Sequence, residues 1–162
     1  MHFEHFVGLI TFIGAFILML LTVPWQEIKK WLLFGFISGL GIAIILLLVM
    51  QNWLGLWVFR KIDFFYLGRI PIILSAAWAP AEIFFAHFFI RYQNPFIRLL
   101  MILFFPALAV AVHFLQIWNR MLVYYHWNYA GTFLVSLAIH FGLAVYLKMR
   151  FYKFARISGG QT

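Results

Sequence analysis

Cysteine is absent from this chain of 162 residues, and acidic residues are scarce. Without cysteine the protein can form no disulfide, no thiolate metal site, no thiol nucleophile and no palmitoyl anchor. Only 10% of the residues are charged, whereas about a quarter are charged in a typical soluble domain. With 66% hydrophobic residues and a mean hydropathy of +0.99, the composition excludes a water-soluble globular fold.

The net charge of +8 comes from twelve Lys and Arg against four acids, which are Glu4, Glu27, Asp63 and Glu82. A basic excess can indicate nucleic-acid binding, but here the basic residues cluster at the ends of apolar runs. That position favours contact with anionic lipid headgroups, so we expect lipid and no nucleic acid as a partner.

Five apolar runs fill most of the sequence, each about 20 residues long and able as a helix to cross a hydrocarbon core roughly 30 Å thick. They cover residues 6–23, 31–50, 70–90, 96–118 and 127–147. These lengths suit helices, which satisfy their own backbone hydrogen bonds in lipid, rather than the short strands of a barrel. The sequence predicts an all-α, polytopic transmembrane bundle of five helices, a single domain over residues 1–157 with a flexible tail at 158–162.

The segments between the runs complete this predicted topology. The first run is expected to be a retained helix, because it ends at Val23, Pro24 and Trp25 rather than at the small residues of a signal-peptide cleavage site. Residues 24–30 are predicted to form a tight turn, and residues 51–69, too charged to span, to lie along the membrane interface. With the N-terminus outside, eight connecting Lys and Arg face the cytoplasm and four face outward. The positive-inside rule therefore predicts an outer N-terminus and a cytoplasmic C-terminus.

Small residues indicate where helices in lipid can approach closely. The run at 70–90 holds the most of them and is predicted to be the central helix, and the other runs carry pairs spaced four residues apart. The positions are Ser75, Ala76, Ala77, Ala79 and Ala81 in that run, and Gly35, Gly39, Ala107, Ala111, Ala138 and Gly142 elsewhere. Packing within one chain is predicted, with a homo-oligomer interface as the alternative. Pro80 and Pro106, inside predicted helices, are expected to kink them and to free a carbonyl each.

Glu82 is the acid that falls near the centre of a predicted span, where a carboxylate costs on the order of 3 kcal/mol and usually has a partner. At 1.5 Å per residue, Glu82 lies about 3 Å and His140 about 4.5 Å past the midpoints of their helices in the same direction. The two side chains could therefore meet. His87 is expected nearer the cytoplasmic face, and His113 nearer the outer face.

Several roles are open for these groups. A Glu82–His140 pair could relay protons or bind a cation, or it could lock the helices together, with Ser75 or a carbonyl freed by Pro80 as a further partner. Two histidines could ligate haem, although His87 and His140 differ by roughly 6 Å in depth. Glu82, His87 and His140 have the ligand types of a metal site but no short-spaced metal motif. No hydrolase, phosphate-loop or metalloprotease motif is present, so no catalytic residue is predicted.

Two further segments are predicted to contact lipid. Basic and aromatic side chains alternate past the last run, which suits docking on an anionic inner leaflet; the basic members are Lys148, Arg150, Lys153 and Arg156. His126 and Asn128 are expected at the outer interface, as solvated residues of an aromatic girdle or as contacts to a headgroup or small ligand.

The stretch from residue 69 to residue 152 resembles a family of small, uncharacterised multi-pass membrane proteins of endospore-forming Firmicutes. The resemblance rests on Arg69-Ile70-Pro71, on His126-Trp127-Asn128 followed by Thr132-Phe133, and on the basic and aromatic residues from Lys148 to Tyr152. Where that family carries acids, this chain has His113, Gln116 and Val123. The resemblance implies a bacterial cytoplasmic membrane and supplies no catalytic residue.

Together these patterns predict a small, non-enzymatic accessory or binding component of a membrane, alone or in a larger complex. The alternative is a proton- or solute-handling transporter, or a haem or quinone redox subunit, that uses Glu82 and the membrane histidines. No cofactor is expected under the first interpretation, and haem is the candidate under the second.

Overall fold

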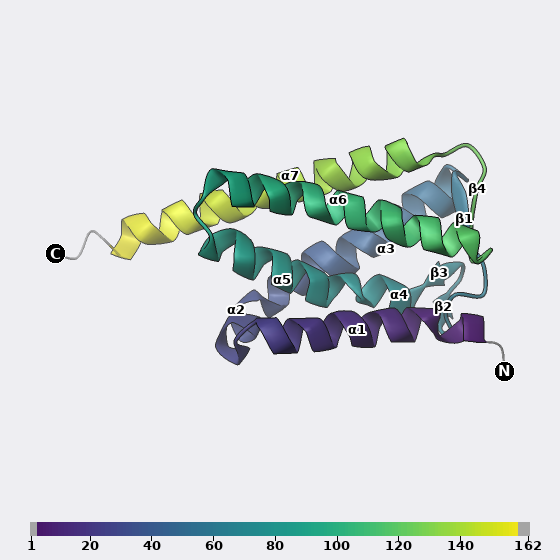
Figure 1. Ribbon diagram of the computed structural model, residues 1–162, viewed down its shortest axis with the longest axis horizontal. Coiled ribbons are helices and arrows are strands. Elements are labelled where there is room, and N and C mark those ends of the chain that lie inside the picture. Colours follow the sequence, from purple (N-terminus) through teal and green to yellow (C-terminus); the bar gives the residue numbers. More distant parts are fainter. Residues whose placement is uncertain (1–2, 159–162) are drawn as a thin grey trace.

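The protein is a bundle of five helical segments arranged along one long axis (Figure 1). The computed structural model describes the backbone of residues 3–158 and the side chains of residues 5–150. The first two segments consist of η1 (Phe3–Phe6) and α1 (Val7–Thr22), then α2 (Trp25–Gly35), η2 (Phe36–Gly41), α3 (Ile42–Leu47) and η3 (Leu48–Trp53). The last three consist of α4 (Ile72–Ala76) and α5 (Trp78–Arg91), then α6 (Pro95–Trp118), then α7 (Tyr129–Ser158).

The five predicted helices are confirmed, and four of them are long and apolar enough to cross a membrane. These four are Trp25–Trp53, Ile72–Arg91, Pro95–Trp118 and Tyr129–Arg150. The first helix, α1, is also apolar but has only 16 residues.

Four short strands gather at one end of the bundle, here named the strand end. They are β1 (Trp57–Phe59), β2 (Tyr66–Leu67), β3 (Ile70–Pro71) and β4 (Leu122–Tyr124). β1 pairs antiparallel with β4 and β2 pairs antiparallel with β3. The stretch at 51–69, predicted to be interfacial, therefore begins in η3 and contributes the strands β1 and β2. The described chain begins at the strand end and finishes beyond the opposite end, here named the turn end (Figure 1).

Buried polar side chains hold the strand end together. The Asp63 carboxylate is 1% exposed and accepts backbone N–H bonds from Phe64 and Phe65 and from Ile73 and Leu74, in the first turn of α4. It satisfies N–H groups that a helix start leaves without intrahelical partners. Gln51 accepts from Phe59 N–H and donates to the Arg69 carbonyl, which ties β1 to the chain before β3.

The predicted turn at 24–30 is wrong in extent. The chain reverses at Val23 and Pro24, and α2 begins at Trp25, because Pro24 has the dihedral angles of a residue just outside a helix and its carbonyl accepts from Ile28 N–H. Residues 25–31 are amphipathic, with Ile28 and Trp31 buried. The charged residues in this stretch, which suggested a turn, therefore lie on the exposed side of a helix.

The central helix is the one predicted. Its apolar window is 61% buried, against 17–28% for the other three long helices. The segment is interrupted at Ala77, three residues before Pro80, whose ring and missing N–H disturb the preceding turn. Gly35 and Gly39 allow close approach here, since a Cβ at Gly39 would lie 2.5 Å from the Ala79 Cα. α6 runs unbroken through Pro106.

The other small-residue pairs do not pack as predicted. The side chains or Cα atoms of Ala107, Ala111, Ala138 and Gly142 are exposed on α6 and α7, and a Cβ at Gly142 would meet nothing within 4 Å. The contacts between these two helices use other faces, because Ala109 and Ala144 are buried instead.

The prediction that the last helix ends at residue 147 is also wrong. α7 continues through Ser158 and extends past the other helices (Figure 1), so the basic and aromatic residues are part of the helix. Of the tail predicted at 158–162, Ser158 is helical and the rest lies outside the described residues.

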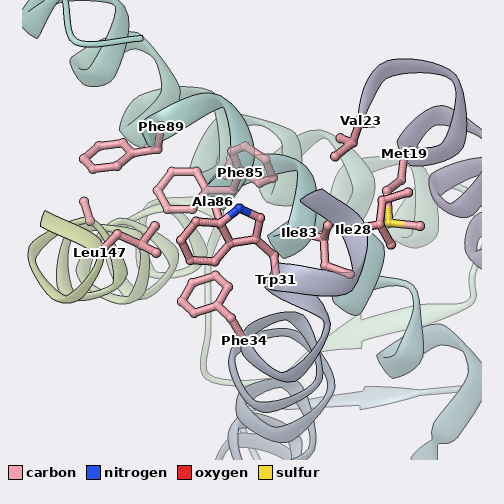
Figure 2. Close-up of a cluster of buried hydrophobic side chains, with 12 residues drawn as sticks. Met19, Val23, Ile28, Trp31, Phe34, Ile83, Phe85, Ala86, Phe89 and Leu147 are labelled. Carbon is pink, nitrogen blue, oxygen red and sulfur yellow. The ribbon is translucent and has the colours of Figure 1, made fainter. Parts of the chain in front are cut away.

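A cluster of apolar side chains fills the half of the bundle toward the turn end. It joins α1, α2, α5, α6 and α7, and Figure 2 shows the Trp31 ring facing side chains from both α5 and α7. Phe85, Ala86 and Leu147 in this cluster are 0% exposed, so this layer is closely packed.

Candidate functional site

A cavity of about 100 Å³ lies between the helices, on the strand-end side of the apolar cluster. The second segment, α4, α5, α6 and α7 form its walls, and Trp57 and Phe59 of β1 cover it. Most of the lining is apolar, but Glu82 and His140 reach its wall, as do His113, Ser38, Ser75, Thr132 and Ser136. The cavity is partly open, and its volume is enough for several water molecules.

Glu82 and His140 form a buried pair at this cavity, as the depth comparison anticipates. Glu82 Oε1 lies 3.2 Å from His140 Nε2, and the two residues are 2% and 3% exposed. The His140 ring is held between neighbours, since it stacks on Phe105 at 5.0 Å and meets the edge of Phe85 at 5.4 Å.

The second ring nitrogen of His140 determines where its hydrogen lies. Nδ1 is 2.8 Å from the Ser136 carbonyl, which can only accept a hydrogen bond, so Nδ1 carries hydrogen. A neutral imidazole then presents a bare lone pair at Nε2, toward an oxygen of Glu82 that is also an acceptor when ionised. The contact is favourable only if one proton lies on Glu82 or on Nε2, and in both cases the pair has no net charge.

Polar atoms around the cavity lack partners. Among the described residues, five buried side-chain atoms have no hydrogen bond of good geometry. Glu82 Oε2, His140 Nε2 and Trp57 Nε1 belong to residues that line the cavity, whereas His87 Nε2 and Gln116 Oε1 do not. Buried polar atoms are nearly always bonded to protein, water or ligand, because leaving one unpaired costs about 1–3 kcal/mol. Three of these five atoms therefore belong to residues around one cavity.

A chain of hydrogen bonds lies at the strand-end side of the cavity. His113 Nδ1 is 2.6 Å from the Tyr124 hydroxyl, which is 2.6 Å from Thr132 Oγ1, and the Trp127 indole donates to the same oxygen. Burial raises the pKa of Tyr124 to about 12, so the phenol is neutral at physiological pH. As expected, His113 lies toward the end where the chain begins; it shares the cavity with Glu82 but makes its hydrogen bond to Tyr124.

His87 does not join this site. Its Nδ1 lies 3.8 Å from Glu27 Oε2, near the turn end, where the same carboxylate accepts from Trp31 and Lys30. The metal set of Glu82, His87 and His140 is therefore not assembled, and within residues 5–150 no three His, Asp or Glu side chains gather around a point. A haem ligated by His87 and His140 is not supported either, because each imidazole faces a different carboxylate.

The remaining predicted lipid contacts lie away from the cavity. Lys148 and Arg150 are exposed on the last part of α7, with Arg150 donating to the Tyr146 hydroxyl, whereas Lys153 and Arg156 lie outside the described side chains. Asn128 has a structural role, since its Oδ1 accepts from Gly131 N–H at the start of α7. His126 is exposed before the same helix.

Sequence reasoning missed several members of the site. Thr132 and Ser136 precede His140 at four-residue intervals, so all three share a helix face, and this polar stripe was visible in the sequence. Trp57 and Tyr124 could not be found that way, because a strand pairing between residues far apart brings Trp57 to the cavity and Tyr124 to His113.

Comparison of the chain with protein-family models, with curated proteins and with solved structures finds no match.

Proposed function

We propose that this protein is a multi-pass membrane protein that binds a small molecule in the cavity beside Glu82 and His140, as a non-enzymatic accessory or binding component. The observation that carries the proposal is that Glu82 Oε2 and Trp57 Nε1, two buried atoms without a hydrogen bond, belong to residues that line one partly open cavity. A purely structural pair would have its hydrogen bonds completed by the protein.

Exposed apolar side chains support a place in the membrane. Leu33, Leu115 and Phe141 are 70%, 59% and 62% exposed, on three of the long apolar helices. An apolar surface of this kind is covered by lipid or by another protein.

Charge supports an outer N-terminus and a cytoplasmic turn end. Six basic residues lie at the turn end, Lys29, Lys30, Arg91, Arg98, Lys148 and Arg150, against four at the strand end, Arg60, Lys61, Arg69 and Arg120. This excess favours the cytoplasmic leaflet and contact with anionic headgroups. The resemblance to Firmicutes membrane proteins favours a bacterial cytoplasmic membrane.

The apolar cluster favours binding over transport. Along α5 from Glu82 toward His87 lie Ile83, Phe85 and Ala86, which are 2%, 0% and 0% exposed. None of the buried members of the apolar cluster lines the cavity, so the cavity ends before this layer.

The test compares two Ala→Leu variants of one helix. Ala109 is 5% exposed and lines the cavity, so Ala109→Leu fills it, whereas Ala107→Leu adds the same atoms on the exposed face. Each protein is purified from bacterial membranes, and the small molecules released by organic solvent are compared by mass spectrometry. We expect a molecule retained by the wild type and by Ala107→Leu and missing from Ala109→Leu. Identical profiles from all three would contradict the proposal.

Proton handling is the second candidate, favoured by the single proton that the Glu82–His140 contact requires. It predicts that proteoliposomes with a trapped pH dye show a proton flux that Glu82→Gln abolishes. Under the binding proposal, wild type and Glu82→Gln give the same flux as empty liposomes.

A further inference from the structure

The exposure of the lining residues locates the mouth of the cavity. Seven lining residues are partly exposed, and five of them lie on two neighbouring walls: Ile42, Ala43 and Leu46 on the second segment, and Val135 and Ile139 on α7. The other two are Trp78 and His113. The mouth therefore lies between the second segment and α7, on the side of the bundle.

The ends of the cavity are closed. Trp57 and Phe59, which cover it at the strand end, are 2% and 8% exposed. Toward the turn end, the second segment and α7 meet where the Phe34 and Tyr146 rings stack with centroids 6.0 Å apart. A ligand consequently enters sideways, from the layer that surrounds the apolar helices.

The size of the cavity limits what it can hold. A cavity of roughly 150 Å³ accommodates a benzene ring, and this one measures about 100 Å³. It takes a small head group with its first few carbons, and the rest of a longer molecule must leave through the mouth. A molecule of this shape is an amphiphile with a small head and a chain that remains in lipid.

The polar atoms of the cavity favour a head group that donates a hydrogen bond. Glu82 Oε2 is a free acceptor, and the Ser38 and Ser75 hydroxyls give their hydrogens to the carbonyls of Phe34 and Pro71, so they also present lone pairs. A carboxylate head would face these lone pairs and be repelled. An ammonium head would bring a charge to a pair that already has no net charge. A hydroxyl donates without either cost.

We propose that the cavity binds the hydroxyl head of a neutral long-chain alcohol. The hydroxyl donates a hydrogen bond to Glu82, and the alkyl chain passes between the second helical segment and α7 into the bilayer. The hydroxyl oxygen is also an acceptor, which suits the unpartnered Trp57 indole N–H of the same cavity. This inference rests on the binding function proposed above.

The test uses four probes of equal chain length, 1-dodecanol, dodecylamine, dodecanoic acid and dodecane, added to the full-length protein in phosphatidylcholine nanodiscs. The readout is the ¹⁵N-labelled indole N–H signal of Trp57, assigned by its loss in Trp57→Phe. We expect 1-dodecanol to shift this signal saturably, with at least tenfold higher affinity than the other probes. The response should persist in Ala107→Leu and disappear in Ala109→Leu, and Glu82→Leu should weaken it tenfold or more.

Each other outcome overturns the alcohol assignment in a distinguishable way. If the amine or the acid binds best, or dodecane binds equally well, the head-group assignment is wrong while the cavity remains a binding site. If no probe shifts Trp57, the assignment is also wrong, and the solvent-extraction comparison decides separately whether the cavity binds anything. A response that Ala109→Leu retains places the alcohol outside the cavity.

Discussion

The two buried carboxylates among the described side chains have opposite surroundings. Asp63, 1% exposed, accepts four backbone N–H bonds and is fully satisfied, which is the pattern of a structural residue. Glu82, 2% exposed, lines the cavity and has one oxygen near His140 and the other without a hydrogen bond. The difference in hydrogen bonding, rather than burial, identifies Glu82 as the candidate for binding.

Replacing Asp63 tests its structural role. In Asp63→Asn one acceptor oxygen becomes an amide donor and faces backbone N–H groups, so we expect unfolding to become easier by about 1–3 kcal/mol. Hydrogen exchange should accelerate at Ile73 and Leu74. The control is Lys61→Gln, on an exposed side chain of the same loop. Equal stability of the two variants would show that these bonds contribute nothing.

The phenol of Tyr124 gives the protein a dependence on alkaline pH. Burial raises its pKa from 10.0 to about 12, so above pH 10 an unfolded chain loses this proton before the folded chain does. The folded state then binds more protons, and stability falls as pH rises from 10 to 12. We expect the ultraviolet titration to contain a late phenol that Tyr124→Phe removes. A titration unchanged by that substitution would contradict the assignment.

The helices pack where glycine permits it, and the sequence alone could not rank the glycines. Gly35 and Gly39 face the central helix, whereas Gly142 has the same spacing to a small residue but faces outward. Small residues spaced four apart mark one face of a helix but do not show whether that face meets another helix. Only the tertiary contacts show which of these glycines are packed.

Adding one methyl group at two glycines measures this difference. Gly39→Ala places a Cβ 2.5 Å from backbone atoms of Ala79 that cannot move independently, and we expect a loss of about 1–3 kcal/mol. Gly142→Ala meets no atom within 4 Å and should be neutral or slightly stabilising. Denaturant unfolding in micelles compares them. A larger loss at Gly142 would mean that the packing of the helices differs from this arrangement.

The helix number and order could be predicted because an apolar run long enough to span lipid is a strong signal. The ends of the helices could not, since Glu27 and Lys148 are charged residues in helical turns near the bundle ends, where hydropathy no longer distinguishes helix from loop. Depth along two helices was enough to anticipate that Glu82 and His140 meet. The strand pair that brings Trp57 to the cavity joins residues some 65 positions apart, and no local pattern encodes it.

The strand end and the turn end lie at opposite ends of the bundle (Figure 1). The chain passes between them through five helical segments, which is an odd number. If the bundle crosses the membrane, the loops at the strand end should therefore all lie in one compartment and the loops at the turn end in the other. The absence of cysteine makes this easy to examine, because every introduced thiol is unique.

Two single-cysteine variants test the orientation. Phe64→Cys places a thiol on an exposed position at the strand end, and Gln93→Cys does so at the turn end. With an impermeant maleimide on intact cells, we expect labelling of the first and protection of the second until the membrane is opened. Labelling of both from outside would contradict the bundle crossing the membrane, and the reverse pattern would invert its orientation.

The most direct test of a laterally open cavity beside the Glu82–His140 pair is the modification of Glu82 by carbodiimides, which react with a carboxyl group when the shared proton lies on it. In native membranes, we predict that small, lipid-soluble diisopropylcarbodiimide modifies Glu82 in the wild type and in Ala107→Leu, and far less in Ala109→Leu, while a water-soluble carbodiimide leaves Glu82 intact. Peptide mass spectrometry locates the adduct. An unmodified Glu82, or equal modification in the two Ala→Leu variants, would contradict the account.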